Sequence, residues 1–239
     1  MNILTFLGHS TVLLQSINKK RILIDPFLDS NPVCPPEFHV NSISPVDHIV
    51  LTHGHSDHTA QAMALAKKSG AKVSATYELA MLISKFSNEE VQVIPMNKGG
   101  TILLPDTDIR LSLLHAVHSN SFDAPDGTTH YAGEACSVLL QLENGKSLFH
   151  AGDTCFFSDM SYIKDKYAPE VACLPIGDCF TMGPREAAIA ASVLGVNIAI
   201  PVHWGTFPLL TGKPDEFKSE CSNLNIESIC LEPGSSMEF

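Results

Sequence analysis

Residues 46–58 have the sequence VDHIVLTHGHSDH, and this segment indicates both the fold and the chemistry of the chain. Its first six residues form a short apolar run of the kind that makes a buried β-strand. Three imidazoles and one carboxylate then follow within six residues, at His53, His55, Asp57 and His58. Because side chains alternate in direction after a strand that ends in a glycine-containing loop, His53 and His55 can converge on one cation while Asp57 and His58 reach a second. The segment therefore predicts a metal site at the end of a strand.

Other predicted strands also end in candidate ligands. His118 follows the run LSLLHAV, Asp153 follows KSLFHAG, and His203 follows IAIPV. Imidazole and carboxylate groups are the ligands that zinc prefers in a catalytic site, where one position stays open for water. A chance cluster of histidines in an exposed turn is the alternative, but groups at several strand ends on a rigid scaffold are what a metal centre needs.

The order of predicted elements indicates an α/β fold. Residues 3–28 predict a hairpin of two strands with a turn at 18–20, and residues 59–69 predict a helix. A strand, a helix and a strand follow at 72–76, 77–86 and 91–96. Strands dominate residues 101–150, with a two-residue hairpin turn at Asn144-Gly145. Helices and strands then alternate again, at about 158–167, 171–176, 184–195, 197–203, 214–222 and 226–232. Two halves of similar pattern predict two sheets packed face to face with helices outside, as one domain over residues 1–239.

The composition limits the classes of partner. A chain of 239 residues with 44% hydrophobic side chains can bury a substantial core, which excludes disorder. The formal net charge of -11 and the lack of basic clusters beyond residues 19–21 argue against nucleic acid. No segment resembles a signal peptide or spans a bilayer, and the seven cysteines contain no C-x-x-C pair. We therefore expect a cytoplasmic protein that binds neither membranes nor nucleic acid.

These residues resemble the metallo-β-lactamase superfamily, whose signature H-x-H-x-D-H is matched at residues 53–58. The resemblance implies an αββα sandwich of two mixed β-sheets with a two-metal site at one edge. It also implies three roles: imidazole ligands of the first metal at His53, His55 and His118, ligands of the second metal at Asp57, His58 and His203, and a bridging carboxylate at Asp153.

Shorter motifs narrow the resemblance. Residues 8–10, 97–100, 150–154, 181–184 and 203–209 are similar to a compact branch of metal-dependent hydrolases, which is itself similar to ascorbate-6-phosphate lactonases. Asp178-Cys179 departs from the usual pattern of this branch. The branch implies hydrolysis of a small ester, lactone or phosphate-containing metabolite, and a homo-oligomer is an expectation at the level of the family.

The implied mechanism follows from the ligands. Two divalent cations, with Zn²⁺ expected and Mn²⁺ or Fe²⁺ as alternatives, would lower the pKa of a shared water from about 15.7 to near 7 and so provide hydroxide. Asp57 would bind metal and orient this hydroxide or accept its proton. A flavodiiron-like redox protein and a non-enzymatic metal-binding protein are the alternative functions. The first typically carries Glu at the position of His55, and the second is disfavoured because all seven ligand positions are occupied.

Several other residues have open roles. His9 is a candidate substrate-binding residue, with a hydrogen-bonded hairpin histidine as the alternative. His115 competes with His118 as a ligand, and the resemblance favours His118. Residues 119–134 form either a lid over the substrate or an ordinary solvated loop. We expect Cys155 to be a buried thiol, His150 to be a packed strand residue, and His39, His48 and His130 to lie on the surface or in loops.

Overall fold

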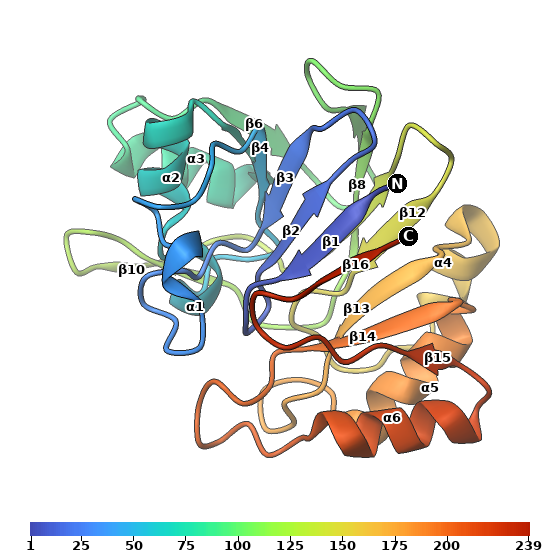
Figure 1. Cartoon of the computed structure of the whole chain (residues 1–239). Coiled ribbons are helices and arrows are strands. Elements are labelled where there is room, and N and C mark those ends of the chain that lie inside the picture. Colours follow the sequence, from blue (N-terminus) through green and yellow to red (C-terminus); the bar gives the residue numbers. More distant parts are fainter.

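Two seven-stranded β-sheets lie face to face, and helices cover the outer surface of each, in the computed structural model, which describes residues 1–239 (Figure 1). Both sheets contain parallel and antiparallel neighbours, so both are mixed. This arrangement confirms the predicted αββα sandwich. No helix combines the length and the apolar character that crossing a membrane requires.

The first sheet comes mainly from the first half of the chain. Its strands are β1 (Ile3–Phe6), β2 (Val12–Gln15), β3 (Arg21–Ile24), β4 (His48–Val50), β5 (Lys72–Thr76), β6 (Val93–Met96) and β16 (Ser236–Glu238). Their order in space is β16-β1-β2-β3-β4-β5-β6. The strands from β3 to β6 run parallel, with α-helices in the connections after β4 and β5.

The second sheet comes from the second half of the chain. Its strands are β7 (Thr101–Leu103), β8 (Arg110–His115), β11 (Cys136–Gln141), β12 (Ser147–His150), β13 (Val171–Pro175), β14 (Ile198–Val202) and β15 (Glu227–Ser228). Their order is β15-β14-β13-β12-β11-β8-β7, and β12 to β15 run parallel. A separate two-stranded ribbon pairs β9 (Ser121–Asp123) with β10 (Thr129–Tyr131).

The helices divide between the two outer faces. The short helix α1 (Ser56–Thr59) follows β4, and α2 (Ala62–Ser69) and α3 (Tyr77–Phe86) cover the first sheet. The second sheet is covered by α4 (Met160–Tyr167), α5 (Pro184–Leu194) and α6 (Pro214–Asn223). A short 3₁₀ helix occupies Pro36–Phe38. The end signals of α5 are those expected from sequence, since Pro184 occupies its first turn and Gly195 ends it with φ +64°.

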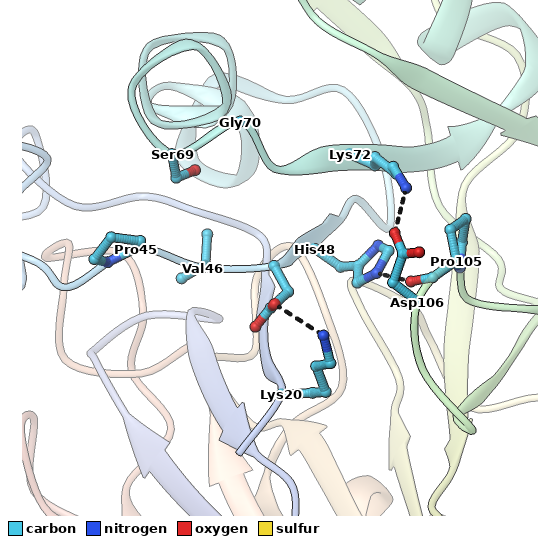
Figure 2. Close-up of a pocket in the computed structure, with 10 residues that line it drawn as sticks. Lys20, Pro45, Val46, His48, Ser69, Gly70, Lys72, Pro105 and Asp106 are labelled. Atoms are coloured by element: carbon cyan, nitrogen blue, oxygen red, sulfur yellow. Dashed lines mark hydrogen bonds and ion pairs between the residues drawn. The ribbon is translucent and has the colours of Figure 1, made fainter. Parts of the chain in front are cut away.

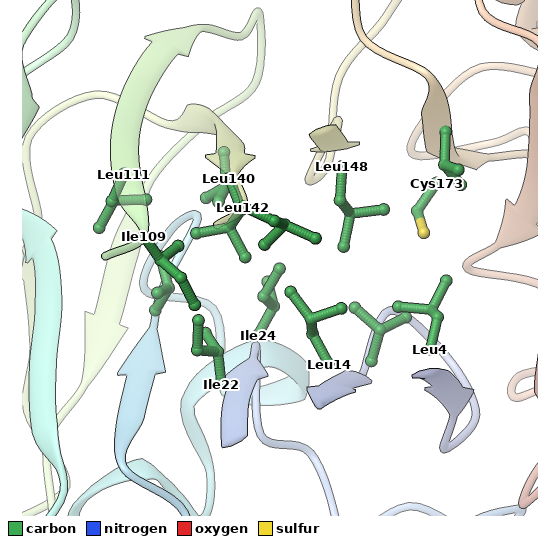
Figure 3. Packing of buried hydrophobic residues seen from close by; sticks show 14 of the residues in the cluster. Leu4, Leu14, Ile22, Ile24, Ile109, Leu111, Leu140, Leu142, Leu148 and Cys173 are labelled. Atoms are coloured by element: carbon green, nitrogen blue, oxygen red, sulfur yellow. The ribbon is translucent and has the colours of Figure 1, made fainter. Parts of the chain in front are cut away.

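Alternating side chains explain why the sheets pack against each other. On β3, Ile22 and Ile24 face the other sheet, whereas Leu23 faces the helices. Figure 3 shows Ile22, Ile24 and their neighbours pointing toward Leu111 and Leu140 of the second sheet. The cluster between the sheets contains 23 buried residues, so this interface is the central core of the molecule.

The parallel strands position polar residues at one edge. Asp25 directly follows β3, and His53 follows β4 after a short turn. In the second sheet, Asp153 follows β12 and His203 follows β14. Because the carboxyl ends of parallel strands lie at the same edge of a sheet, the two packed sheets bring these groups toward one place.

The predicted first strand is wrong in one respect. Residues 3–15 form two strands rather than one, because Gly8 and His9 have φ values of +97° and +57° and turn the chain back between β1 and β2. The turn at Asn144-Gly145 joins β11 to β12 as predicted, but Leu142 pairs with Lys146, so the loop has three residues. Gly145 takes the left-handed conformation that such a loop requires, with φ +82°.

Two other boundaries differ from the sequence prediction. The helix expected over 59–69 is interrupted before Ala62, where the Gln61 side chain accepts a hydrogen bond of 2.6 Å from the Leu28 backbone N–H. The last predicted strand, 226–232, pairs with β14 only at Glu227–Ser228. The chain then crosses to the first sheet, where β16 pairs with β1.

Candidate metal centre

The first group of candidate ligands consists of His53, His55 and His118. One ring nitrogen of each lies within 4.8 Å of the others. The closest pair is His53 Nε2 and His55 Nδ1, 2.9 Å apart. Two ligands of one tetrahedral zinc ion are separated by about 3.3 Å, given zinc–nitrogen bonds of roughly 2.0–2.1 Å. This group therefore has the spacing of a three-imidazole site.

The second group consists of His9, Asp57, His58 and His203, with one ligand atom of each within 4.8 Å of the others. The two groups are adjacent, since the ring centroids of His53 and His58 are 4.1 Å apart. Six of the seven ligand residues expected from sequence are thus brought to one place, and His9 joins the second group.

Asp153 lies between the two groups. Its Oδ2 is 3.6 Å from His118 Nε2 and 3.1 Å from His203 Nε2, and its Oδ1 is 3.4 Å from His58 Nε2. Asp153 Oδ1, His58 Nε2 and His203 Nε2 are nevertheless buried without a hydrogen-bond partner. Buried polar atoms are normally paired, so atoms that converge without pairing fit cations held between them.

Comparison with known proteins agrees with this geometry. Residues 20–204 match the family described as the β-lactamase superfamily domain. This chain belongs to the metallo-β-lactamase superfamily. A protein of Rubrobacter xylanophilus named a metal-dependent hydrolase is 41% identical over 224 residues, which cover 94% of this chain and 90% of that protein. Another with the same description, from Koribacter versatilis, is 43% identical over 215 residues, which cover 90% of this chain and 89% of that protein.

A solved structure extends the likeness to the whole fold. A metallo hydrolase from the hyperthermophilic archaeon Ignicoccus hospitalis has 30% sequence identity and a TM-score of 0.86, covering 100% of this chain and 99% of its own. The protein is accordingly an enzyme, a metal-dependent hydrolase of the metallo-β-lactamase superfamily. The names of these relatives as hydrolases disfavour the redox and non-enzymatic alternatives, and the likeness to ascorbate-6-phosphate lactonases stays a prediction.

Beside the superfamily signature, the structure reveals a buried carboxylate that sequence reasoning missed. Asp25 Oδ1 accepts a hydrogen bond from the Thr52 backbone N–H at 2.8 Å, and Oδ2 accepts one from the Thr52 hydroxyl at 2.6 Å. Oδ2 also accepts a bond of 2.8 Å from His58 Nδ1. The available signal was its position directly after a strand, next to the end of β4.

This carboxylate fixes which ring nitrogens are free to bind a metal. Because His58 Nδ1–H donates to Asp25, the Nε2 that faces Asp153 is the nitrogen that carries the lone pair when this imidazole is neutral. The Thr52 hydroxyl donates to Asp25, so its oxygen accepts from His53 Nδ1–H at 3.0 Å. Nε2 of His53 is then also unprotonated. One carboxylate thereby orients an imidazole in each group.

His9 supports Asp57 in a similar way. Its Nε2 lies 3.0 Å from Asp57 Oδ2, and its Nδ1 lies 3.0 Å from the Thr206 hydroxyl. A carboxylate can only accept, so Nε2–H donates to Asp57 and the hydroxyl donates to Nδ1. His9 is fully buried and does not line the cavity beside the ligands, which favours a role behind Asp57 over direct substrate contact.

The site favours the neutral imidazole at His53, His55 and His118 and the ionised carboxylate at Asp153. Burial lowers the pKa of His53 well below its usual value, and it also lowers the pKa of His55 and His118. Burial opposes the ionisation of Asp153, yet His203 and His58 hold the pKa of its carboxyl well below the usual range. Neutral imidazole and carboxylate are the protonation states that bind a metal.

His58 and His9 differ from each other in charge preference. Burial disfavours the charged form of His58, but Asp153 and Asp25 on either side raise its pKa well above the usual value. Burial lowers the pKa of His9 to about 4, against the opposing effect of its hydrogen bond to Asp57. The region around His58 therefore attracts positive charge, whereas His9 stays neutral at pH 7.

A cavity of about 260 Å³ opens directly onto the candidate ligands. Its lining consists of His55, Asp57, His118, Ser119, Asp153, Phe180 and His203. Another cavity, of about 290 Å³, lies at the opposite end of β4 and contains Lys20, His48 and Lys72 (Figure 2). None of the candidate ligands lines this second cavity, so the cavity of about 260 Å³ beside the candidate ligands is the candidate substrate site.

The predictions for the histidines outside the site agree with the structure at some positions and fail at another. His115 is exposed, with Nδ1 3.2 Å from Lys98 Nζ, so His118 rather than His115 lies beside Asp153. His150 is a packed strand residue, as expected. The expectation for His48 is wrong: it is buried in β4, and its Nε2 lies 2.9 Å from the Pro105 carbonyl oxygen. β4 is paired on both sides, and the loop before β8 contacts its first residue through Pro105.

One further expectation is wrong, and the segment after His118 has a defined form. Cys155 is exposed rather than buried, because the chain leaves the sheet edge directly after Asp153. Residues 119–134 contain the β9–β10 ribbon, and the base of this ribbon is tied to the signature segment. Asn120 Oδ1 accepts a hydrogen bond of 2.7 Å from the Gly54 N–H, and a Cβ at Gly54 would lie 2.6 Å from the Ser121 carbonyl oxygen.

Proposed function

We propose that this hydrolase acts as a single domain, residues 1–239, that binds two divalent cations. In this proposal His53, His55 and His118 hold the first cation, Asp57, His58 and His203 hold the second, and Asp153 bridges them. Zn²⁺ is the cation that we expect, because imidazole and carboxylate ligands suit it, with Mn²⁺ or Fe²⁺ as alternatives. The observation that carries the proposal is the position of Asp153, with one or other oxygen within 3.6 Å of an imidazole from each group.

The burial of the site supports the same proposal. Asp153 and Asp25 are both buried, and buried carboxylates are costly unless a positive charge or several hydrogen-bond donors compensate them. Asp25 has three donors. Asp153 Oδ1 has none, so a bound cation is the partner that would compensate it.

The reaction that we propose is hydrolysis at the cavity beside the ligands. When bound, the two cations would supply hydroxide from water near neutral pH and polarise the oxygen of the scissile group. Asp57 lines this cavity, so its carboxylate can orient the attacking water or accept its proton. His9 holds that carboxylate in place from behind and keeps its pKa low, together with His58 and against the effect of burial.

The substrate that we propose is a small ester, lactone or phosphate-containing metabolite, since a cavity of about 260 Å³ suits a small molecule. The net charge of -11 argues against nucleic acid as a partner. We also propose a cytoplasmic location, which is supported by seven free cysteines.

The test combines metal analysis with a substrate panel. Purified protein from metal-supplemented growth should carry about two transition-metal ions per chain. Its hydrolysis of a phosphodiester, a lactone, a thioester and a β-lactam is measured in parallel. Asp153→Ala should lose both bound metal and hydrolysis, whereas Asp126→Ala, on the exposed ribbon turn, should keep both. A correctly folded wild-type protein without metal would refute the proposal, and so would wild-type activity in Asp153→Ala.

A further inference from the structure

Phe180 is the one apolar residue that lines the cavity beside the ligands. Five of the seven lining residues are the proposed ligands His55, Asp57, His118, Asp153 and His203, and the other two are Ser119 and Phe180. The Phe180 side chain is large, yet the residue is 51% exposed. An exposed aromatic ring beside a reactive centre is a surface that a bound molecule can cover.

The loop that carries Phe180 has an unusual backbone. The two residues before it, Asp178 and Cys179, have φ values of +61° and +50°. Non-glycine residues rarely adopt this left-handed conformation, and such strain persists only where the surroundings enforce it. Here the Asp178 N–H donates to the Met182 carbonyl oxygen at 3.0 Å, and the Met182 N–H donates to the Thr154 carbonyl oxygen at 3.1 Å. The loop is therefore anchored beside Asp153.

The same loop also packs closely against His203, a proposed ligand. A Cβ on Gly177 would lie 2.3 Å from the His203 carbonyl oxygen and 3.0 Å from its Nδ1, so only glycine allows this close approach. The backbone that carries Phe180 is thus a strained turn whose two ends pack against His203 and Thr154. A ring attached to an anchored backbone at a cavity wall can select among substrates better than one on a mobile loop.

The charged side chains that line the cavity also bear on the substrate class. No lysine or arginine lines it, although these side chains are the usual protein groups that bind a phosphate. Outside the proposed ligands, the lining consists of Ser119 and Phe180, which suit an apolar group better than an additional anionic one.

We propose that Phe180 determines specificity by packing against an apolar acyl or alkyl group next to the scissile bond. The preferred substrate is then a carboxylic ester or lactone that bears such a group, rather than a phosphate-containing metabolite. This inference rests on the proposed hydrolase function and narrows its substrate class.

The test compares two chromogenic esters that differ only in acyl length, p-nitrophenyl acetate and p-nitrophenyl hexanoate, with the metal-loaded enzyme. The wild type should prefer the hexanoate. Phe180→Ala should lower kcat/KM for the hexanoate by roughly tenfold, mainly through KM, and change the acetate little, because a few methylenes in an apolar pocket are worth at least that factor. Phe180→Leu should keep most of the preference, and Tyr131→Ala, at a 74% exposed aromatic residue, should match the wild type.

Binding provides a second readout that is independent of turnover. Calorimetric titration of the metal-loaded protein with hexanoate and acetate should give tighter hexanoate binding in the wild type and nearly equal affinities in Phe180→Ala. Equal losses for both esters and both acids in Phe180→Ala would overturn the inference, as would a wild-type preference for bis-p-nitrophenyl phosphate. Failure of metal-loaded wild type to hydrolyse any ester, lactone or phosphodiester would instead overturn the proposed function itself.

Discussion

Replacing Asp25 by Asn tests the claim that one buried carboxylate orients imidazoles in both groups. Asp25 accepts three hydrogen bonds, one at Oδ1 and two at Oδ2, and its side chain is fully buried. The amide of Asn has the same shape but only one oxygen, so one of the two positions must become an NH₂ donor.

Each orientation of the amide has a different cost. If NH₂ replaces Oδ2, it donates to His58 Nδ1, which moves the imidazole proton to Nε2 and blocks the nitrogen that faces Asp153. Loss of such a supporting partner typically lowers metal affinity about 10–100-fold, or roughly 1.4–2.7 kcal/mol. If NH₂ replaces Oδ1, it opposes the Thr52 N–H, and a buried unpaired donor costs about 1–3 kcal/mol of stability.

The assay measures both quantities on the same samples. Metal affinity comes from competition with a chelator, and the free energy of unfolding of the metal-free protein comes from denaturant titration. Asp47→Asn is the matched control, because Asp47 lies at the opposite end of β4 and is partly exposed. Asp25→Asn with unchanged metal affinity and unchanged unfolding free energy would refute the reasoning.

Three further predictions concern the same fold. Thr206→Val removes the hydroxyl that bonds His9 Nδ1 at 3.0 Å, so activity should fall roughly tenfold while metal content stays unchanged; equal activity would contradict the role of His9. Burial lowers the pKa of His48, so this imidazole binds a proton more readily in the unfolded state than in the folded state. The contribution of neutral His48 to the free energy of unfolding is therefore present above pH 6.5 and is lost as pH falls below that value. Denaturant titrations from pH 7 to 5 should therefore show that the free energy of unfolding falls more steeply in the wild type than in His48→Gln, by at most about 1.4 kcal/mol per pH unit. The same pH dependence of the unfolding free energy in both proteins would contradict this. Leu140→Ala empties part of the core between the sheets and should cost about 2–5 kcal/mol of unfolding free energy, whereas Leu103→Ala, at a 56% exposed position, should cost little.

The sequence predicted the layers of this fold well because its patterns are local. Apolar runs such as residues 46–51 and helix end signals such as Pro184 and Gly195 depend on neighbouring residues only. The predictions of strands and turns were wrong where contacts between residues far apart in the sequence determine the structure. The turn at His9 is stabilised by the second sheet, since its carbonyl oxygen accepts a hydrogen bond from the His203 N–H at 2.6 Å. Strand β16 exists because it pairs with β1, at the other end of the sequence.

The candidate ligands were predictable for a similar reason. Four of them occur within six residues, and the other three follow predicted strands. Asp25 was missed because a single aspartate before a proline has no distinctive spacing, and its role depends on Thr52 and His58 more than 25 residues away. Phe180 was also beyond reach of pattern analysis, because its exposure depends on how the loop before α5 packs on His203.

The division of the proposed ligands between the two sheets has a consequence for synthesis. The signature segment, ending at His58, leaves the ribosome well before His203, with a delay of roughly ten seconds at the usual rate of elongation. Until Asp153 and the second sheet arrive, a captured cation has few ligands and exchanges freely with solution. Full metal loading therefore becomes possible only once both halves have docked. A newly made chain with tightly bound metal is one that has completed its fold.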